Sequence, residues 1–207
     1  MNLVVRIPLQ VSAEQHARLH SLQATFADAC NALAVVVRDT CCWNRVALHH
    51  MTYKAMRERF PDLGSQMVCN AVYSVSRASR LVYQHPSSPF NLSALGGRAL
   101  PLLRFAASCP VYFDRHTLSL KGSKLSMYTL DGRMHFELAL LPEDQRAFHE
   151  RKLREIVLSS QDNDIFLLTF RFEANDANTS QLGEAAALEM GDVDNKIPDY
   201  LSVDAEL

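Results

Sequence analysis

The sequence predicts an α+β protein in which a helical segment is inserted into a β domain. Three observations predict this class: an alternating apolar strand opens the chain, segments with the 3.6-residue helical period follow to about residue 83, and from residue 111 the apolar period is two. The opening strand has no β neighbour close in sequence, so we expect it to pair with the later strands. The 207 residues, 48% of them hydrophobic, fit one or two folded domains.

The first strand is expected over residues 2–9. Its apolar face carries Leu3, Val5, Ile7 and Leu9. Pro8 lacks a backbone N–H, which favours a position at the edge of a sheet. A helix should then run from residue 13 to about residue 38, because Ser12 and Gln15 form a capping box and apolar residues recur behind them at helical spacing.

Two more helices and an irregular connector are expected before the β part. One helix should start near Thr52 and stop before Pro61, and the next, capped by Ser65, should run to Tyr83. The apolar stripe of the later helix is Val68, Ala71, Val72, Val75 and Val82. Proline and glycine are frequent in residues 84–110, so we expect no regular structure there.

Two hairpins separated by a short helix account for the rest of the folded part. Residues 125–130 and 133–138 alternate around Asp131-Gly132, which predicts a type I′ turn with two positive-φ residues. A short polar helix is expected over about residues 142–154. Residues 155–159 and 165–172 then predict a second hairpin.

Charge divides the chain into a basic body and an acidic tail. Residues 173–207 contain nine acidic residues and one basic residue, a net charge of −8, so the overall −2 leaves +6 on residues 1–172. A basic body is suited to phosphate binding, although a solvated surface with a solubility tail has the same balance. We therefore expect a β domain of residues 1–11 plus 106–173, a helical domain and connector of residues 12–105, and an unstructured tail of residues 174–207.

Several classes of protein are disfavoured. No apolar run approaches the roughly 20 residues of a membrane helix, and no signal-peptide pattern opens the chain, so a cytoplasmic protein without membrane contact is expected. The five cysteines form no C-x-x-C pair, and His16 and His20 share a helix face without a third ligand nearby, so we expect no metal or other cofactor. No phosphate-loop, nucleophile-elbow or metalloprotease motif occurs, and Cys41-Cys42-Trp43 lacks a local base.

Basic and aromatic residues supply the positive signal. The third helix has one face, opposite the valine stripe, with side chains that can contact bases or phosphates: Gln66, Asn70, Tyr73 and Arg77. The preceding helix adds Tyr53, Lys54 and Arg57. In the β part, Arg115, Lys121, Lys124 and Arg133 cluster around the rings of Tyr112, Phe113 and Tyr128, a pattern suited to RNA. An ordinary helix face and ordinary strand exteriors are the alternative interpretation.

Seven stretches resemble the motifs of one family, in that family's order. Residues 4–15 resemble its opening strand and "P-T-x-E-Q" helix start, 26–31 resemble "F-N-x-A-C-N", 44–60 resemble "N-x-x-x-L-H-x-x-x-Y-x-x-x-R-x-x-F", and 65–75 resemble "S-Q-M-A-x-x-A-I-x-K-V". Residues 112–119, 125–133 and 165–168 resemble "Y-D-x-R-x-x-S", "V-S-I-x-T-L-x-G-R" and "F-Y-L". Together they resemble the N-terminal portion of the TnpB family, the insertion-sequence OrfB proteins related to type V CRISPR effectors.

The resemblance implies a wedge domain, a small oligonucleotide-binding-like β-barrel, with an inserted helical recognition domain. It implies that Arg115, Lys121, Lys124, Tyr128 and Arg133 serve a guide RNA and that the helical residues serve target double-stranded DNA. The family continues into a RuvC-type nuclease that opens with "G-V-D-L-G". Here the corresponding segment is 191–195, where Asp192 or Asp194 is a relic of the first catalytic aspartate, and the later metal ligands are missing. Two-metal cleavage needs several converging carboxylates, so no catalysis by this chain is expected.

The expected function is that of a nuclease-lacking, RNA-guided DNA-binding subunit that acts with a partner protein. One alternative is the recognition half of a split RuvC-type nuclease. Another is a protein-interaction module without a nucleic-acid role, which would leave the +6 body unexplained.

Overall fold

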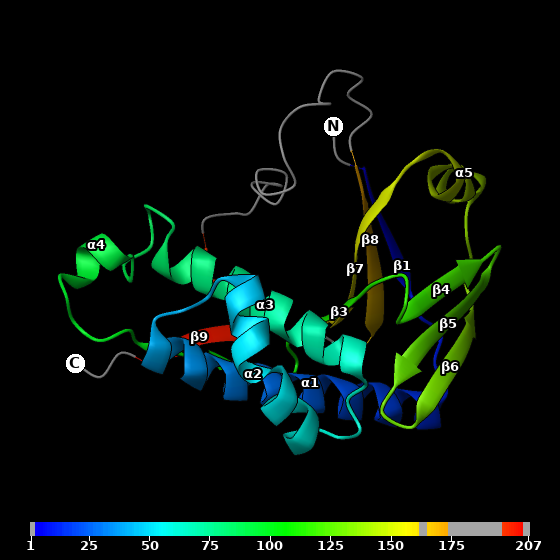
Figure 1. The fold of residues 1–207 in the computed structure, drawn as a ribbon. Coiled ribbons are helices and arrows are strands. Elements are labelled where there is room, and N and C mark those ends of the chain that lie inside the picture. Colours follow the sequence, from blue (N-terminus) through cyan, green and yellow to red (C-terminus); the bar gives the residue numbers. More distant parts are fainter. Residues whose placement is uncertain (1–2, 162–164, 174–195, 205–207) are drawn as a thin grey trace.

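The computed structural model describes residues 3–161, 165–173 and 196–204 (Figure 1). Its helices are α1 (Ala13–Thr40), α2 (Arg45–Arg59), α3 (Ser65–Tyr83), α4 (Leu92–Leu95) and α5 (Pro142–Glu150). Its strands are β1 (Leu3–Pro8), β2 (Leu102–Phe105), β3 (Val111–Phe113), β4 (Leu118–Lys121), β5 (Lys124–Thr129), β6 (Gly132–Glu137), β7 (Leu153–Ser160), β8 (Phe166–Phe172) and β9 (Leu201–Asp204). The predicted α+β class is confirmed.

The strands form three antiparallel sheets. Their orders are β1-β8-β7-β3, β4-β5-β6 and β2-β9. The opening strand lies at the edge of the first sheet and pairs with β8, with Val5 opposite Phe170, as its pattern predicted. The helices α1 to α3 are therefore inserted between two paired strands of one sheet. Among the described strands no closed barrel forms.

The long helix α1 links the helical part to both larger sheets. Figure 1 shows it along the base of the molecule, from beneath α2 and α3 to the three-stranded sheet. The Ser12–Gln15 capping box that the sequence predicted is present at its start. Gln15 also donates to the backbone oxygen of His135 on β6, and Arg18 pairs with Asp131 at 2.6 Å. These contacts protect the β6 edge of the three-stranded sheet.

One apolar core runs through both parts. On α1 the buried side chains include Leu19, Leu22, Phe26 and Leu33, and α3 packs against α1, α2 and β3. The valine stripe predicted for the third helix is buried, as are Phe166 and Phe170 of β8. This packing holds the helical insertion against the four-stranded sheet.

Two helix starts were wrongly predicted. α2 begins one residue after Asn44, whose side-chain oxygen accepts hydrogen bonds from the amides of Val46 and Ala47. This cap starts the helix seven residues before Thr52. Ser65 is the first residue of α3 and not its cap, since the cap position is Gly64 and no side chain caps it.

The connector and the tail contain strands that the sequence did not predict. Residues 102–105 form β2 and pair with β9, so residues 201–204 of the predicted unstructured tail are a strand. Leu103 and Leu201 of this pair are buried. Residues 174–195, including Asp192 and Asp194, lie outside the described residues.

The β5–β6 turn differs from the predicted type I′ geometry. Thr129 pairs with Gly132, so Leu130 and Asp131 are the central residues, and of the turn residues only Gly132 has a positive φ, of 110°. The two central residues lack the positive φ that a type I′ turn requires. The positive φ falls instead on Gly132, the residue that follows them. The helix predicted over about 142–154 ends at Glu150, because residues 153–155 already belong to β7.

Candidate nucleic-acid interface

The outward face of the three-stranded sheet carries most of the predicted RNA-binding residues. Alternation places the apolar residues Leu125, Met127, Met134 and Phe136 inward, where they are buried. Lys124 and Tyr128 of β5 therefore point outward, and Lys121 and Arg133 lie opposite them in the register. All four are exposed, as is Arg115 in the turn before β4. The sheet thus brings the five predicted residues to one end of the molecule.

Arg133 and Tyr128 form a flat, cationic pair on this face, next to the β5–β6 turn. The guanidinium carbon of Arg133 lies 4.3 Å from the centre of the Tyr128 ring. Its N–H groups donate to the Ser126 hydroxyl at 3.1 Å and to the backbone oxygen of His116 at 3.1 Å. These bonds fix the Arg133 guanidinium over the Tyr128 ring, so the stacked pair is ordered before any ligand binds.

Two acidic residues lie near this face without cancelling its charge. Glu137 is opposite Lys124 in the register and accepts a hydrogen bond from Ser123. Asp131 is paired with Arg18, and the pKa of Asp131 is lowered by its hydrogen bonds from Arg18 and Thr129. Arg115, Lys121, Lys124 and Arg133 supply four positive charges to the end of the sheet, so the balance stays positive.

Two of the three rings expected on this surface belong to the core instead. Tyr112 and Phe113 of β3 are 8% and 4% exposed. β3 is covered by α3 on one side and pairs with β7 on the other. Tyr128 therefore provides the exposed aromatic surface among the three rings named by the sequence.

The predicted DNA-binding face of α3 is interrupted at Asn70. Its side chain is 6% exposed and donates to the backbone oxygen of Tyr112 at 2.9 Å. The amide therefore holds α3 against β3 and cannot pair with a base. The half-exposed positions of the helix are Gln66, Cys69, Tyr73, Arg77, Arg80 and Leu81.

Tyr73 and Arg77 point to the carboxylate of Glu155 on β7. Its Oε1 atom accepts from the Tyr73 hydroxyl at 3.0 Å and from Arg77 at 2.5 Å. Arg171 of β8 approaches the Oε2 atom at 3.3 Å. Glu155 is 13% exposed at its side chain, so these groups form a junction network between α3 and the sheet. The two α3 side chains therefore make contacts within the protein that the sequence did not predict.

Burial dominates the acid–base properties around this network. It raises the pKa of the Tyr73 and Tyr112 hydroxyls, and the negative charge of Glu155 adds to both shifts. Burial alone would lower the pKa of Arg77, but the neighbouring Tyr112, Glu155 and Tyr73 raise it overall. At neutral pH the network therefore holds a charged guanidinium and neutral phenols.

The other predicted DNA-binding residues lie on or near the surface of the helical part. Lys54 is exposed and Gln66 is half-buried. Tyr53 is half-buried and stacks on His49, with ring centres 4.8 Å apart. Arg57 donates to the backbone oxygen of Leu63 at 2.6 Å, which closes the turn between α2 and α3. Contact of Tyr53, Lys54 and Gln66 with DNA stays a prediction. The same holds for Arg57, which also stabilises the α2–α3 turn.

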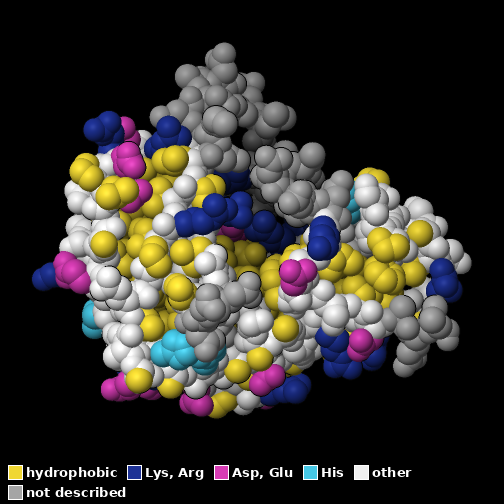
Figure 2. All heavy atoms as spheres, turned by 180° about the vertical axis from the view of Figure 1, so that it is seen from behind, with side chains coloured by type: hydrophobic (Ala, Val, Ile, Leu, Met, Phe, Trp, Pro, Cys, Tyr) yellow, Lys and Arg dark blue, Asp and Glu magenta, His cyan; other side chains and the backbone are white. Residues whose placement is uncertain are grey.

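Basic side chains also gather on the opposite side of the molecule from the view of Figure 1. Figure 2 shows Lys and Arg side chains around a hollow near the middle of that face. Acidic side chains lie there too, both beside the basic ones near the middle and toward the margins of that face. Part of the net positive charge of residues 1–172 is thus visible on this face as a group of Lys and Arg side chains.

The part of the chain that the structure describes contains no cluster of metal ligands. In that part no three His, Cys, Asp or Glu side chains come together as a metal site would need, and no helix is long and apolar enough to cross a membrane. His16 and His20 contact each other and the ring of Phe166. Trp43 packs against Tyr83 with ring centres 5.5 Å apart.

Sequence reasoning missed Glu155, which organises the α3–sheet junction. A single carboxylate in an apolar strand was the available signal, but its partners lie 78 and 82 residues away. A scan against models of protein families finds no match to this sequence, and a search of curated proteins finds none either.

Proposed function

We propose that this chain is an RNA-binding subunit of an RNA-guided DNA-recognition complex. The observation that carries the proposal is the outward face of β4 to β6, here called the RNA face. It carries the stacked pair of Arg133 and Tyr128 near the β5–β6 turn, and Lys121 and Lys124 at the β4–β5 turn. Binding of single-stranded RNA needs cations for the backbone and exposed rings for the bases. This face offers both within three neighbouring strands.

Each side chain of the face has a distinct task. The lysines neutralise phosphates and release condensed counterions, which makes the affinity strongly dependent on salt. Tyr128 offers one ring for stacking, and the guanidinium of Arg133 lies against that ring already. Because the hydrogen bonds of Arg133 to Ser126 and His116 order it beforehand, little side-chain entropy is lost on binding.

The resemblance to the TnpB family supplies the rest of the proposal. The β strands of residues 1–11 and 106–173 act as an oligonucleotide-binding-like wedge for a guide RNA. Tyr53, Lys54, Arg57 and Gln66 contact the target double-stranded DNA, without Asn70, Tyr73 and Arg77. A partner protein in the cytoplasm provides the effector step, and this chain contributes recognition and not catalysis.

A charge-matched pair of triple variants tests the RNA face. Full-length protein with Lys121, Lys124 and Arg133 all replaced by alanine should bind a fluorescein-labelled, mixed-sequence single-stranded RNA at least about tenfold more weakly at roughly 100 mM salt. The slope of log K against log salt should fall by about 2. The control replaces Arg59, Arg98 and Arg146, which are exposed elsewhere on the chain. Equal binding by both triple variants, or none by the unmodified protein, would overturn the proposal.

A further inference from the structure

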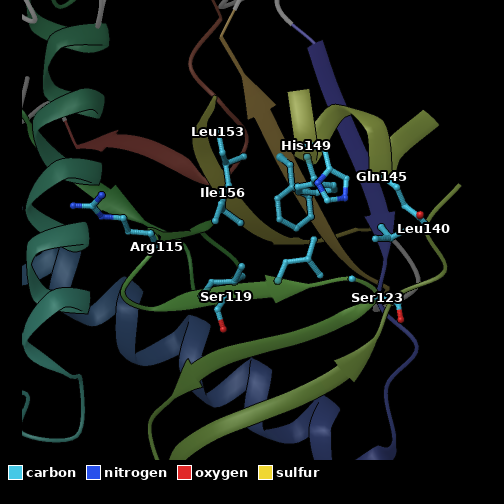
Figure 3. Close-up of a pocket in the computed structure, with 13 residues that line it drawn as sticks. Arg115, Ser119, Ser123, Leu140, Gln145, His149, Leu153 and Ile156 are labelled. Carbon is cyan, nitrogen blue, oxygen red and sulfur yellow. The ribbon is translucent and has the colours of Figure 1, made fainter. Parts of the chain in front are cut away.

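A cavity of about 560 Å³ lies between β4, α5 and the start of β7 (Figure 3). Its lining residues are Arg115, Leu118, Ser119, Leu120, Gly122, Ser123, Leu140, Gln145, Phe148, His149, Leu153, Ile156 and Phe170. The volume falls within the range of sites for small organic ligands. The cavity borders the side of β4 that faces away from β5, where the three-stranded sheet ends.

The lining of the cavity is apolar at its centre and polar at its ends. Figure 3 shows Leu153 and Ile156 above the cavity, with His149 and Gln145 toward one end. The guanidinium of Arg115 lies at the other end and is directed away from the remaining labelled side chains. The lining contains no Asp or Glu, so the cavity suits an apolar group attached to an anion.

The cavity adjoins the β4 edge of the RNA face. Gly122 and Ser123 line it and also form the turn between Lys121 and Lys124. Arg115 lines it and belongs to the same set of exposed cations. A phosphodiester backbone held by these cations therefore passes the mouth of an apolar pocket.

We propose that this cavity takes one unstacked base of the bound nucleic acid, an inference that rests on the proposed RNA-binding function. The base enters between the leucines of β4 and the rings of Phe148 and Phe170, while its phosphate stays outside with the cations. Splayed-out bases in single-stranded RNA are commonly held by apolar and aromatic contacts and by hydrogen bonds to their edges. Gln145 and His149, both exposed, supply those hydrogen bonds.

The test fills the cavity without touching the charge of the face. Leu153→Trp adds a large ring at a lining residue that is 38% exposed, and Leu141→Trp adds the same ring at a nearby residue that is 57% exposed and does not line the cavity. The probe is a fluorescein-labelled, mixed-sequence single-stranded RNA, with circular dichroism as the check on folding. We expect about a tenfold loss of affinity for Leu153→Trp, an unchanged salt slope, and less than a twofold change for Leu141→Trp.

The outcomes separate the pocket from the RNA face. Equal RNA affinity of both tryptophan variants and the unmodified protein overturns the pocket and leaves the proposed function standing. If Leu153→Trp is misfolded, the variants Gln145→Ala and His149→Ala are measured instead. We expect them to lose RNA affinity several-fold, by an amount that depends on the base. If both variants bind RNA of every base as tightly as the unmodified protein does, the pocket is also overturned.

Titration with free adenosine monophosphate distinguishes the source of the base. One outcome is that the unmodified protein binds the nucleotide but not the RNA, and that Leu153→Trp blocks nucleotide binding. This outcome supports the pocket as a site for a free nucleotide and overturns the proposed function. No binding of either RNA or nucleotide by the unmodified protein overturns both.

Discussion

Glu155 connects two α3 side chains that lie far from it in sequence with an arginine on the neighbouring strand. Its carboxylate binds Tyr73 and Arg77 of α3 and approaches Arg171 of β8. Spacing along α3 predicts correctly that Gln66, Tyr73 and Arg77 share a face, because that periodicity is local. It cannot show that a strand 78 residues later supplies the partner of Arg77, since this pairing depends on how the sheet packs.

Removing this carboxylate should destabilise the fold. In Glu155→Ala the two arginines lose their shared counter-charge and the Tyr73 hydroxyl loses its acceptor, at a carboxylate whose side chain is 13% exposed. We expect a loss of about 2 kcal/mol in the free energy of unfolding, measured by urea denaturation. The control is Asp39→Ala, because the Arg38–Asp39 pair is exposed, and it should change stability by less than about 0.5 kcal/mol. Equal losses in the two variants would show that the junction network adds no stability.

At the scale of elements, the strongly periodic segments were predicted best. β1, α1, α3 and the two hairpins follow from the alternation or helical spacing of buried residues. The start of α2 was missed because Asn44 caps a helix whose first turn has no clear apolar stripe. β2 and β9 were missed because four-residue strands 96 or more residues apart carry almost no local signal, and each is defined by the other.

The β2–β9 pair should open when its buried contact is removed. Leu201 is 5% exposed, and the ion pair of Arg104 with Asp204 at the other end is 54% exposed on both sides. Such an exposed pair adds little, so Leu201→Asp should release β9. Hydrogen exchange of the Ala106 amide, which donates to the backbone oxygen of Tyr200 just before β9, should then accelerate by at least about tenfold, while the exposed Ser202→Asp control leaves it unchanged. Equal exchange in the variant and the control would contradict the role of Leu201.

At the scale of the whole molecule, buried phenols couple the helical part to the sheets. Burial raises the pKa of Tyr73, Tyr83, Tyr112 and Tyr200. These residues come from α3, from β3 and from the segment before β9. The Tyr83 hydroxyl donates to the backbone oxygen of Pro101, which ties the end of α3 to the chain entering β2.

Stability should therefore fall at high pH. Above the ordinary tyrosine pKa near 10, the unfolded chain loses phenolic protons that the folded protein keeps, so the folded state binds more protons. This contribution is fully present below about pH 9 and decreases as the pH rises through about 10 and beyond. Urea midpoints at about pH 8, 9 and 11 should be level between the first two and lower at the third. A midpoint that stays constant to about pH 11 would contradict the burial of these hydroxyls.

The charge division that the sequence shows becomes a surface in the folded molecule. The +6 of residues 1–172 is expressed in the exposed cations of the three-stranded sheet and in the basic hollow of Figure 2. Composition predicted a phosphate-binding body, but it could not identify the sheet whose pleat would bring Lys121, Lys124, Tyr128 and Arg133 to one side. That arrangement depends on the register of β4, β5 and β6.

Sequencing of the RNA that co-purifies with the full chain from its host tests the central claim most directly. At moderate salt the unmodified protein should carry one defined RNA species. The Lys121, Lys124 and Arg133 triple-alanine variant should lose that RNA, while the Arg59, Arg98 and Arg146 control retains it. Recovery of no defined RNA with the unmodified protein, or of the same RNA in the same amount with the triple-alanine variant, would contradict RNA binding by the β4–β6 face.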